Sequence, residues 1–109
     1  MAINHAKSGE VVDLGPLGEN LQNAKTTALV KSDAFEAVRL VVPAGKDIPS
    51  HSVSGPITLH CLEGRVVIGL QTTTLELSAG QWIYLNGGES HSLRGVEDAS
   101  LLLTIIFPR

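Results

Sequence analysis

The fold is decided by the stretch ITLHCLEGRVVIGLQTTTLELSAGQWIYL, residues 57–85. It consists of short runs rich in β-branched and apolar residues, separated by small or polar breaks at 63–64 and 78–80. Runs of this length between turn signals are typical of β-strands. We therefore predict strands at 57–62, 65–71, 72–77 and 81–85, with a hairpin turn at Glu63–Gly64.

The same pattern continues on both sides of this stretch. Further strands are predicted at 29–30, 35–42, 91–93 and 99–107, and residues 46–55 are expected to be loop with a short extended piece. Eight or nine short strands with frequent turn signals indicate an all-β antiparallel sandwich or barrel. A helical interpretation conflicts with the β-branched content, and an α/β fold would need helix-length segments between the strands.

The N-terminal segment differs from the rest of the chain. Residues 1–25 are weakly patterned, with Gly15, Pro16 and Gly18 as interruptions, and only 19–25 could form a short helical turn. We predict an arm over residues 1–25 that lies against a single barrel domain over residues 26–109.

The composition excludes several classes of partner and location. The 109 residues carry 8 Lys or Arg and 11 Asp or Glu, and this net charge of -3 offers no basic surface for nucleic acid. No apolar run reaches the roughly 20 residues of a membrane-spanning helix, and the first residues do not resemble a signal peptide. A single cysteine excludes an internal disulfide and a cysteine-rich zinc site. We expect a soluble, cytoplasmic protein.

Two groups of residues resemble the motifs of the cupin superfamily. Its first motif is a glycine, five residues, His-x-His, three or four residues, Glu, six residues and a glycine; its second is a glycine, five residues, Pro-x-Gly, two residues and a His. The matching residues are Gly45, His51 and Gly64 for the first motif, and Gly80, Gly88 and His91 for the second. The resemblance covers residues 35–107 and implies a small, single-domain RmlC-like cupin, which is an antiparallel jelly-roll β-barrel.

The match departs from the family at three ligand or turn positions. Val53 replaces the second histidine of the first motif, the glutamate position falls on Ile57 or Thr58, and Asn86 replaces the proline of the second motif. The usual four-ligand metal site of the family is therefore only partly present.

The resemblance implies a divalent transition metal (iron, manganese, nickel, zinc or copper) on the barrel histidines, or no metal at all. His51 and His91 stand at family ligand positions, and His60 is the other barrel histidine that could supply a third ligand. Side chains alternate along a strand, so the alignment of the glutamate position with Thr58 puts His60 inside, whereas alignment with Ile57 puts it outside. We expect the inward placement.

Two functions follow from this pattern. The first is a metal-dependent cupin that acts on a small molecule, with chemistry of the dioxygenase, isomerase or decarboxylase type implied by the family. The second is a metal-free binding or sensory module with an apolar cavity. In both cases we expect Val53, Thr58, Trp82 and Tyr84 to line the pocket. No charge run or repeat supports a third possibility, a purely structural protein.

The chain also shows more apolar surface than one small domain can bury. Residues 65–70 and 101–107 are apolar at nearly every position, and a domain of this size covers only about 65% of the surface that its unfolded chain exposes. A homodimer formed through one sheet would cover the excess, as would the N-terminal arm. We expect the homodimer, and the arm belongs either to its own barrel or to the partner's.

Overall fold

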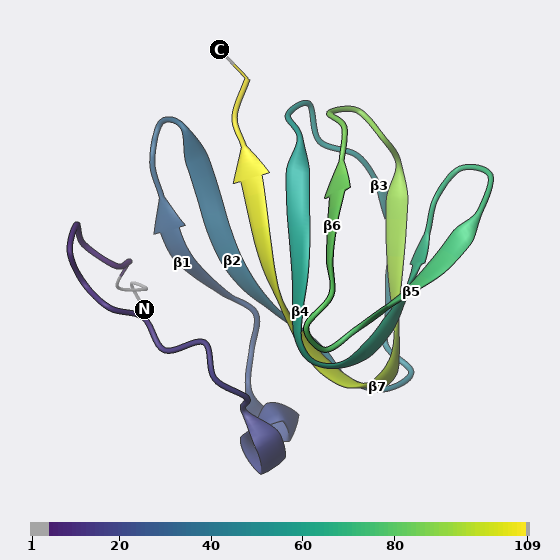
Figure 1. Cartoon of the computed structure of the whole chain (residues 1–109), viewed down its shortest axis with the longest axis horizontal. Coiled ribbons are helices and arrows are strands. Elements are labelled where there is room, and N and C mark those ends of the chain that lie inside the picture. Colours follow the sequence, from purple (N-terminus) through teal and green to yellow (C-terminus); the bar gives the residue numbers. More distant parts are fainter. Residues whose placement is uncertain (1–4, 109) are drawn as a thin grey trace.

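The computed structural model describes residues 5–108, which form one 3-10 helix and seven strands (Figure 1). In chain order these are η1 (Gly18–Asn23), β1 (Thr27–Lys31), β2 (Phe35–Val42), β3 (Asp47–His51), β4 (Ile57–Gly69), β5 (Thr74–Ser78), β6 (Trp82–Leu85) and β7 (His91–Ile106). None of the helical segments in this part of the chain is long and apolar enough to cross a membrane. The all-β antiparallel prediction is confirmed.

The strands form one continuous antiparallel sheet that folds over on itself. Its main path is β1-β2-β7-β4-β5, while β3 pairs with β7 and β6 pairs with β4. The C-terminal half of β7 therefore lies between β2 and β4, and β6 extends this half of the sheet beyond β4 (Figure 1). The N-terminal half of β7 lies between β3 and the second half of β4. The result is a jelly-roll barrel whose two walls share the long strands β4 and β7.

The predicted hairpin turn at Glu63–Gly64 is wrong, because β4 runs through it. The register between β4 and β7 shifts at Cys61/Glu63 and Glu63/Arg65, and these irregularities bend both strands from one wall into the other. Gly64 has φ +76° and lies so close to Asp98 that a Cβ atom would collide with its carbonyl. The two strands predicted at 91–93 and 99–107 are likewise one strand, β7.

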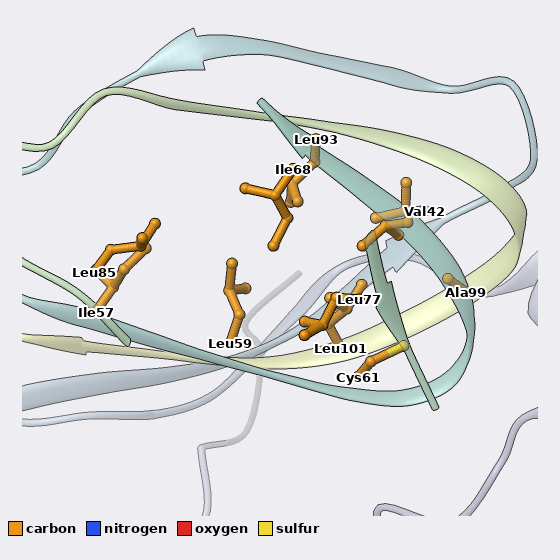
Figure 2. Packing of buried hydrophobic residues seen from close by; sticks show 11 residues of the cluster. Val42, Ile57, Leu59, Cys61, Ile68, Leu77, Leu85, Leu93, Ala99 and Leu101 are labelled. Carbon is orange, nitrogen blue, oxygen red and sulfur yellow. The ribbon is translucent and has the colours of Figure 1, made fainter. Parts of the chain in front are cut away.

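The core lies between the two walls and follows the alternation of β4. Ile57, Leu59 and Cys61 are all at most 3% exposed and point inward. Ile68 and Leu93 extend from the opposite wall toward Leu59 (Figure 2). Full burial of each such side chain stabilises the fold by roughly 1.5–3 kcal/mol. A one-residue slip of β4 would exchange these side chains for Thr58, His60 and Leu62, so the core fixes the register.

The N-terminal arm is held against the barrel by a half-buried carboxylate, that of Glu63. Both Glu63 carboxylate oxygens accept hydrogen bonds from the Leu17 N–H at 2.9 and 3.0 Å, and the Gly18 N–H and the Ser100 hydroxyl also donate to this group. Arg39 Nη2 lies 3.3 Å from Glu63 Oε2 and donates to the Gly15 carbonyl at 2.7 Å. These contacts hold residues 15–18 against the barrel, and η1 (Gly18–Asn23) overlaps most of the helical turn predicted at 19–25.

These contacts change the acidity of Glu63. Burial raises the pKa of its carboxyl group, but the hydrogen bonds from Leu17, Ser100 and Gly18 and the charge of Arg39 oppose that effect and outweigh it. The pKa of Glu63 therefore lies below its ordinary value, and the charged form is the one that holds the arm.

Candidate functional site

A pocket of about 130 Å³ lies inside the barrel, between the two walls of the folded sheet. Five aliphatic side chains and two imidazoles line it. These are Leu40 from β2, Ile48 and His51 from β3, Leu59 from β4, and His91, Leu93 and Leu103 from β7. Each wall contributes, so the pocket exists only because the sheet folds over on itself.

The pairing of β3 with β7 brings the two histidines together. His51 and His91 are direct register partners across these antiparallel strands, a position in which side chains on one face contact each other. Their ring centroids are 4.5 Å apart and the rings are tilted by 56°. His91 is only 5% exposed, whereas His51 is exposed to solvent. One imidazole therefore lies deep in the pocket and the other at its rim.

The same local hydrogen bond orients both rings. His51 Nδ1 lies 3.0 Å from the Pro49 carbonyl oxygen, and His91 Nδ1 lies 3.0 Å from the Glu89 carbonyl oxygen. A carbonyl oxygen can only accept, so each neutral ring carries its hydrogen on Nδ1. This assignment leaves the lone pair of each Nε2 free to accept a hydrogen bond or to bind a metal ion.

The expected inward placement of His60 is wrong. Ile57, Leu59 and Cys61 occupy the buried face of β4, and His60 lies between Leu59 and Cys61 on the opposite face. Its register partners are Trp82 on β6 and Leu102 on β7. The apolar residues occupy the interior because burial of an unpaired imidazole destabilises the fold, whereas burial of isoleucine and leucine stabilises it. His60 cannot join His51 and His91 in the pocket.

The four residues expected to line the pocket lie elsewhere. Thr58 shares the outer face of β4 with His60, and its register partner is Tyr84. Trp82 and Tyr84 are 59% and 52% exposed. Val53 packs against the core but is not part of the pocket lining. The aliphatic residues that do line it were not predicted. One of the two possible alignments of β4, with Ile57 at the glutamate position, does put Leu59 on the inward face.

The side chains around the pocket do not fit the metal site of the family. Structural and catalytic metal centres in proteins generally use three or four protein ligands, and the pocket offers two imidazoles among aliphatic side chains. Within residues 5–108 there is no group of three or more His, Cys, Asp or Glu side chains placed to hold a metal ion. The departures at Val53 and at Ile57 or Thr58 are therefore not compensated by donors from other strands.

Comparison with solved structures identifies the architecture. A cupin superfamily protein from Desulfitobacterium hafniense matches with a TM-score of 0.78 at 13% identity, over 99% of this chain and 100% of that one. The chain has the cupin fold. A conserved protein of unknown function from Streptococcus pyogenes gives a TM-score of 0.77 at 24% identity, over 100% and 97% of the two chains.

A second structure described as a cupin agrees over a shorter span. An RmlC-like cupin from Shewanella frigidimarina gives a TM-score of 0.71 at 17% identity, over 77% of this chain and 76% of that one. No protein-family model and no curated protein matches the sequence. At these identities the likeness describes the fold, and the function of this cupin domain has to be argued from its own pocket.

Proposed function

We propose that this small cupin domain is a cytoplasmic binding protein for a small, mostly apolar molecule that carries a hydroxyl or another hydrogen-bond donor. The observation that carries the proposal is the aliphatic pocket lined by two neighbouring imidazoles, each of which has its Nδ1 against a backbone carbonyl. An apolar cavity with a few convergent polar groups is the general form of a small-molecule site.

The volume of the pocket limits the ligand. A cavity of roughly 150 Å³ lined by aliphatic and aromatic side chains binds benzene, and the pocket here measures about 130 Å³. It suits a single ring or a short branched chain. Larger ligands would need displacement of Leu40 or Leu103, which are packed against the core cluster.

The histidine pair selects the polar group. Each Nδ1 is occupied by a backbone carbonyl, so a neutral His51 and His91 present two acceptors and no donor to the ligand. A ligand hydroxyl group can donate a hydrogen bond to one of these acceptors. An ionised carboxylate has no hydrogen to donate and would face the lone pairs of both Nε2 atoms. A net hydrogen bond of this kind contributes about 0.5–1.5 kcal/mol, which corresponds to roughly a twofold to thirteenfold gain in affinity.

The test compares phenol with benzene, two probes that differ by one hydroxyl group. We expect both to raise the thermal unfolding midpoint, and phenol to bind more tightly by isothermal titration calorimetry. In His91→Ala the preference for phenol should fall by roughly twofold to thirteenfold, because one acceptor is lost. His60→Ala is the matched control, since this histidine lies on the outer face of β4, and its affinities should equal those of the wild type.

A second variant separates binding in the pocket from binding elsewhere. Leu103 lines the pocket, and Leu103→Phe fills part of the cavity with a side chain that keeps the core apolar. Loss of benzene binding in this folded variant supports the pocket. If neither probe binds the wild type, or if both still bind Leu103→Phe at full affinity, the proposal is wrong.

A metal-dependent function is the alternative, and one observation favours it. A histidine that binds a metal through one ring nitrogen usually donates a hydrogen bond from the N–H of the other to a carbonyl or carboxylate. The Nδ1 atoms of His51 and His91 make such bonds here, to backbone carbonyls. With two protein ligands, the remaining coordination positions of the metal would be open to water or substrate. Elemental analysis of wild-type protein, His51→Ala and His91→Ala decides between the functions. A stoichiometric transition metal that is lost in both variants would support metal-dependent chemistry and contradict the metal-free proposal.

A further inference from the structure

The connection from β6 to β7 contains the turn Asn86-Gly87-Gly88 (Figure 1). Of the four asparagines in the chain, Asn86 alone is followed by glycine, and both Asn86 and Gly87 are exposed to solvent. Such a pair is chemically labile, because the backbone nitrogen of the glycine is held beside the side-chain amide and no Cβ atom hinders closure of a succinimide ring. The turn is therefore a candidate site of covalent modification.

The fold requires a glycine after Asn86. A Cβ atom at Gly87 would collide with the carbonyl oxygen of Ser54, in the connection from β3 to β4. The next residue, Gly88, has φ +82°, and its N–H donates to the Val53 carbonyl at 2.7 Å. The two connections pack together only because position 87 has no side chain, so the labile pair is a consequence of this packing.

Two features prepare the Asn86 amide for attack. The N–H of Gly87 makes no hydrogen bond within residues 5–108, so the attacking nitrogen is accessible to base from solvent. The Tyr84 hydroxyl donates a hydrogen bond to Asn86 Oδ1 at 3.1 Å. Negative charge develops on this oxygen as the nitrogen attacks Cγ, and a donor that already points at such an oxygen lowers the barrier.

We propose that Asn86–Gly87 is a site of spontaneous deamidation, promoted by the hydrogen bond from Tyr84. Hydroxide from solvent takes the Gly87 N–H proton, the nitrogen bonds to Asn86 Cγ, and the Cγ–Nδ2 bond breaks as ammonia leaves with a proton from water. A second water molecule then opens the succinimide. Cleavage of the new bond to Cγ gives aspartate, whereas cleavage of the bond to the Asn86 carbonyl carbon gives isoaspartate. The net reaction consumes one water and releases one ammonia.

The products change the turn in different ways. Each adds one negative charge to a chain of net charge -3. Isoaspartate also routes the main chain through Cβ and Cγ, so the former Asn86 carbonyl becomes part of a free carboxylate. That carbonyl accepts the Glu89 N–H at 3.3 Å, and the Glu89 carbonyl lies 3.0 Å from His91 Nδ1. Isoaspartate therefore alters the turn that leads to the deeper histidine of the pocket.

Peptide mapping of aged protein tests the site. Folded wild-type protein is incubated in mildly alkaline buffer and digested with trypsin, which leaves Asn86 in residues 66–94 and both Asn20 and Asn23 in residues 8–25. Mass spectrometry should show progressive loss of the Asn86 amide, with an equal amount of ammonia released, while the other two amides stay intact. An Asn86 that is no more reactive than Asn20 and Asn23 would overturn the proposed site.

The role of Tyr84 is tested by Tyr84→Phe, which removes the hydroxyl group and keeps the ring. Tyr84 is 52% exposed, so the substitution leaves the core unchanged. Asn86 in the folded variant should deamidate roughly twofold to thirteenfold more slowly, as expected for loss of one hydrogen bond. In urea the fixed contact is absent, and the two proteins should react at equal rates. Equal rates in the folded proteins, or an equally slow variant in urea, would contradict this role.

The effect on the turn is tested with Asn86→Asp, which reproduces the aspartate product with an unchanged main chain. Its thermal unfolding midpoint should equal that of fresh wild-type protein. Aged protein, separated from unmodified chains by anion exchange, should unfold at a lower temperature in proportion to its isoaspartate content, measured with an isoaspartate-specific methyltransferase. Aged protein rich in isoaspartate that unfolds with Asn86→Asp would overturn the proposed effect on the turn.

Discussion

At the scale of single residues, Gly64 determines the path of β4. It combines φ +76° with a backbone contact to Asp98 that leaves no room for a Cβ atom. A left-handed backbone costs an L-residue roughly 1–2 kcal/mol. We predict that Gly64→Ala lowers the free energy of unfolding by more than this amount, as measured by urea denaturation. Gly45→Ala is the matched control, because Gly45 has φ +83° but nothing within 4 Å. Equal losses in the two variants would show that the contact with Asp98 is unimportant.

The histidines show which site residues could be predicted from the sequence. His51 and His91 were identified by motif spacing, and the structure pairs them across β3 and β7. His60 was misplaced because the alternation of β4 allows two alignments, and a threonine–histidine face suits a cavity or solvent equally well. The choice depends on the walls that close over β4, and Leu40, Leu93 and Leu103 come from other strands. Local sequence does not contain that information.

At the scale of elements, the contact between the arm and β4 should depend on pH. The folded pKa of Glu63 lies below its ordinary value, so the contribution of this group to stability is fully present above about pH 4.3, the value for an unfolded chain. It is lost as the pH falls through the folded pKa. We predict that stability measured by urea denaturation declines in this acidic range in the wild type.

The corresponding variant is Glu63→Gln, which keeps the shape of the side chain and removes its charge. It should lower stability at neutral pH by about 1–3 kcal/mol, since the hydrogen bonds from Leu17 and Gly18 weaken and Arg39 loses its ion-pair partner. The decline specific to acidic pH should become shallower. An unchanged pH profile would mean that other carboxylates account for the acid sensitivity.

The long strands could not be resolved by sequence patterns alone. Most strand positions were predicted from apolar runs and turn residues, but β4 and β7 were each divided in two. A glycine such as Gly64 is a common turn signal, and here it marks a bend at which β4 passes between walls while still paired with β7. Distinguishing a bend from a turn requires the partner strand, since the hydrogen bonds continue through one and end at the other.

At the scale of the whole molecule, association and folding should be linked. The homodimer expected from the sequence would form only between folded chains, so a rise in protein concentration would stabilise the native state by mass action. We predict that the thermal unfolding midpoint of the wild type rises by several degrees between low and high micromolar concentration. Trp82 is 59% exposed on β6, so the charge introduced by Trp82→Glu should oppose association and make the midpoint less dependent on concentration. Scanning calorimetry at matched heating rates measures both.

The ligand and the expected dimer contact should contribute to this stability separately. Leu102 pairs with His60 on the outer face of the sheet, whereas its neighbour Leu103 lines the pocket, so β7 carries these two residues on opposite faces. Phenol should therefore raise the midpoint of Trp82→Glu by as much as it raises that of the wild type at equal saturation. If the shift vanishes in Trp82→Glu while the variant remains folded by circular dichroism, the pocket depends on the dimer. β7 would then transmit the state of the outer face to Leu103 and the ligand beside it.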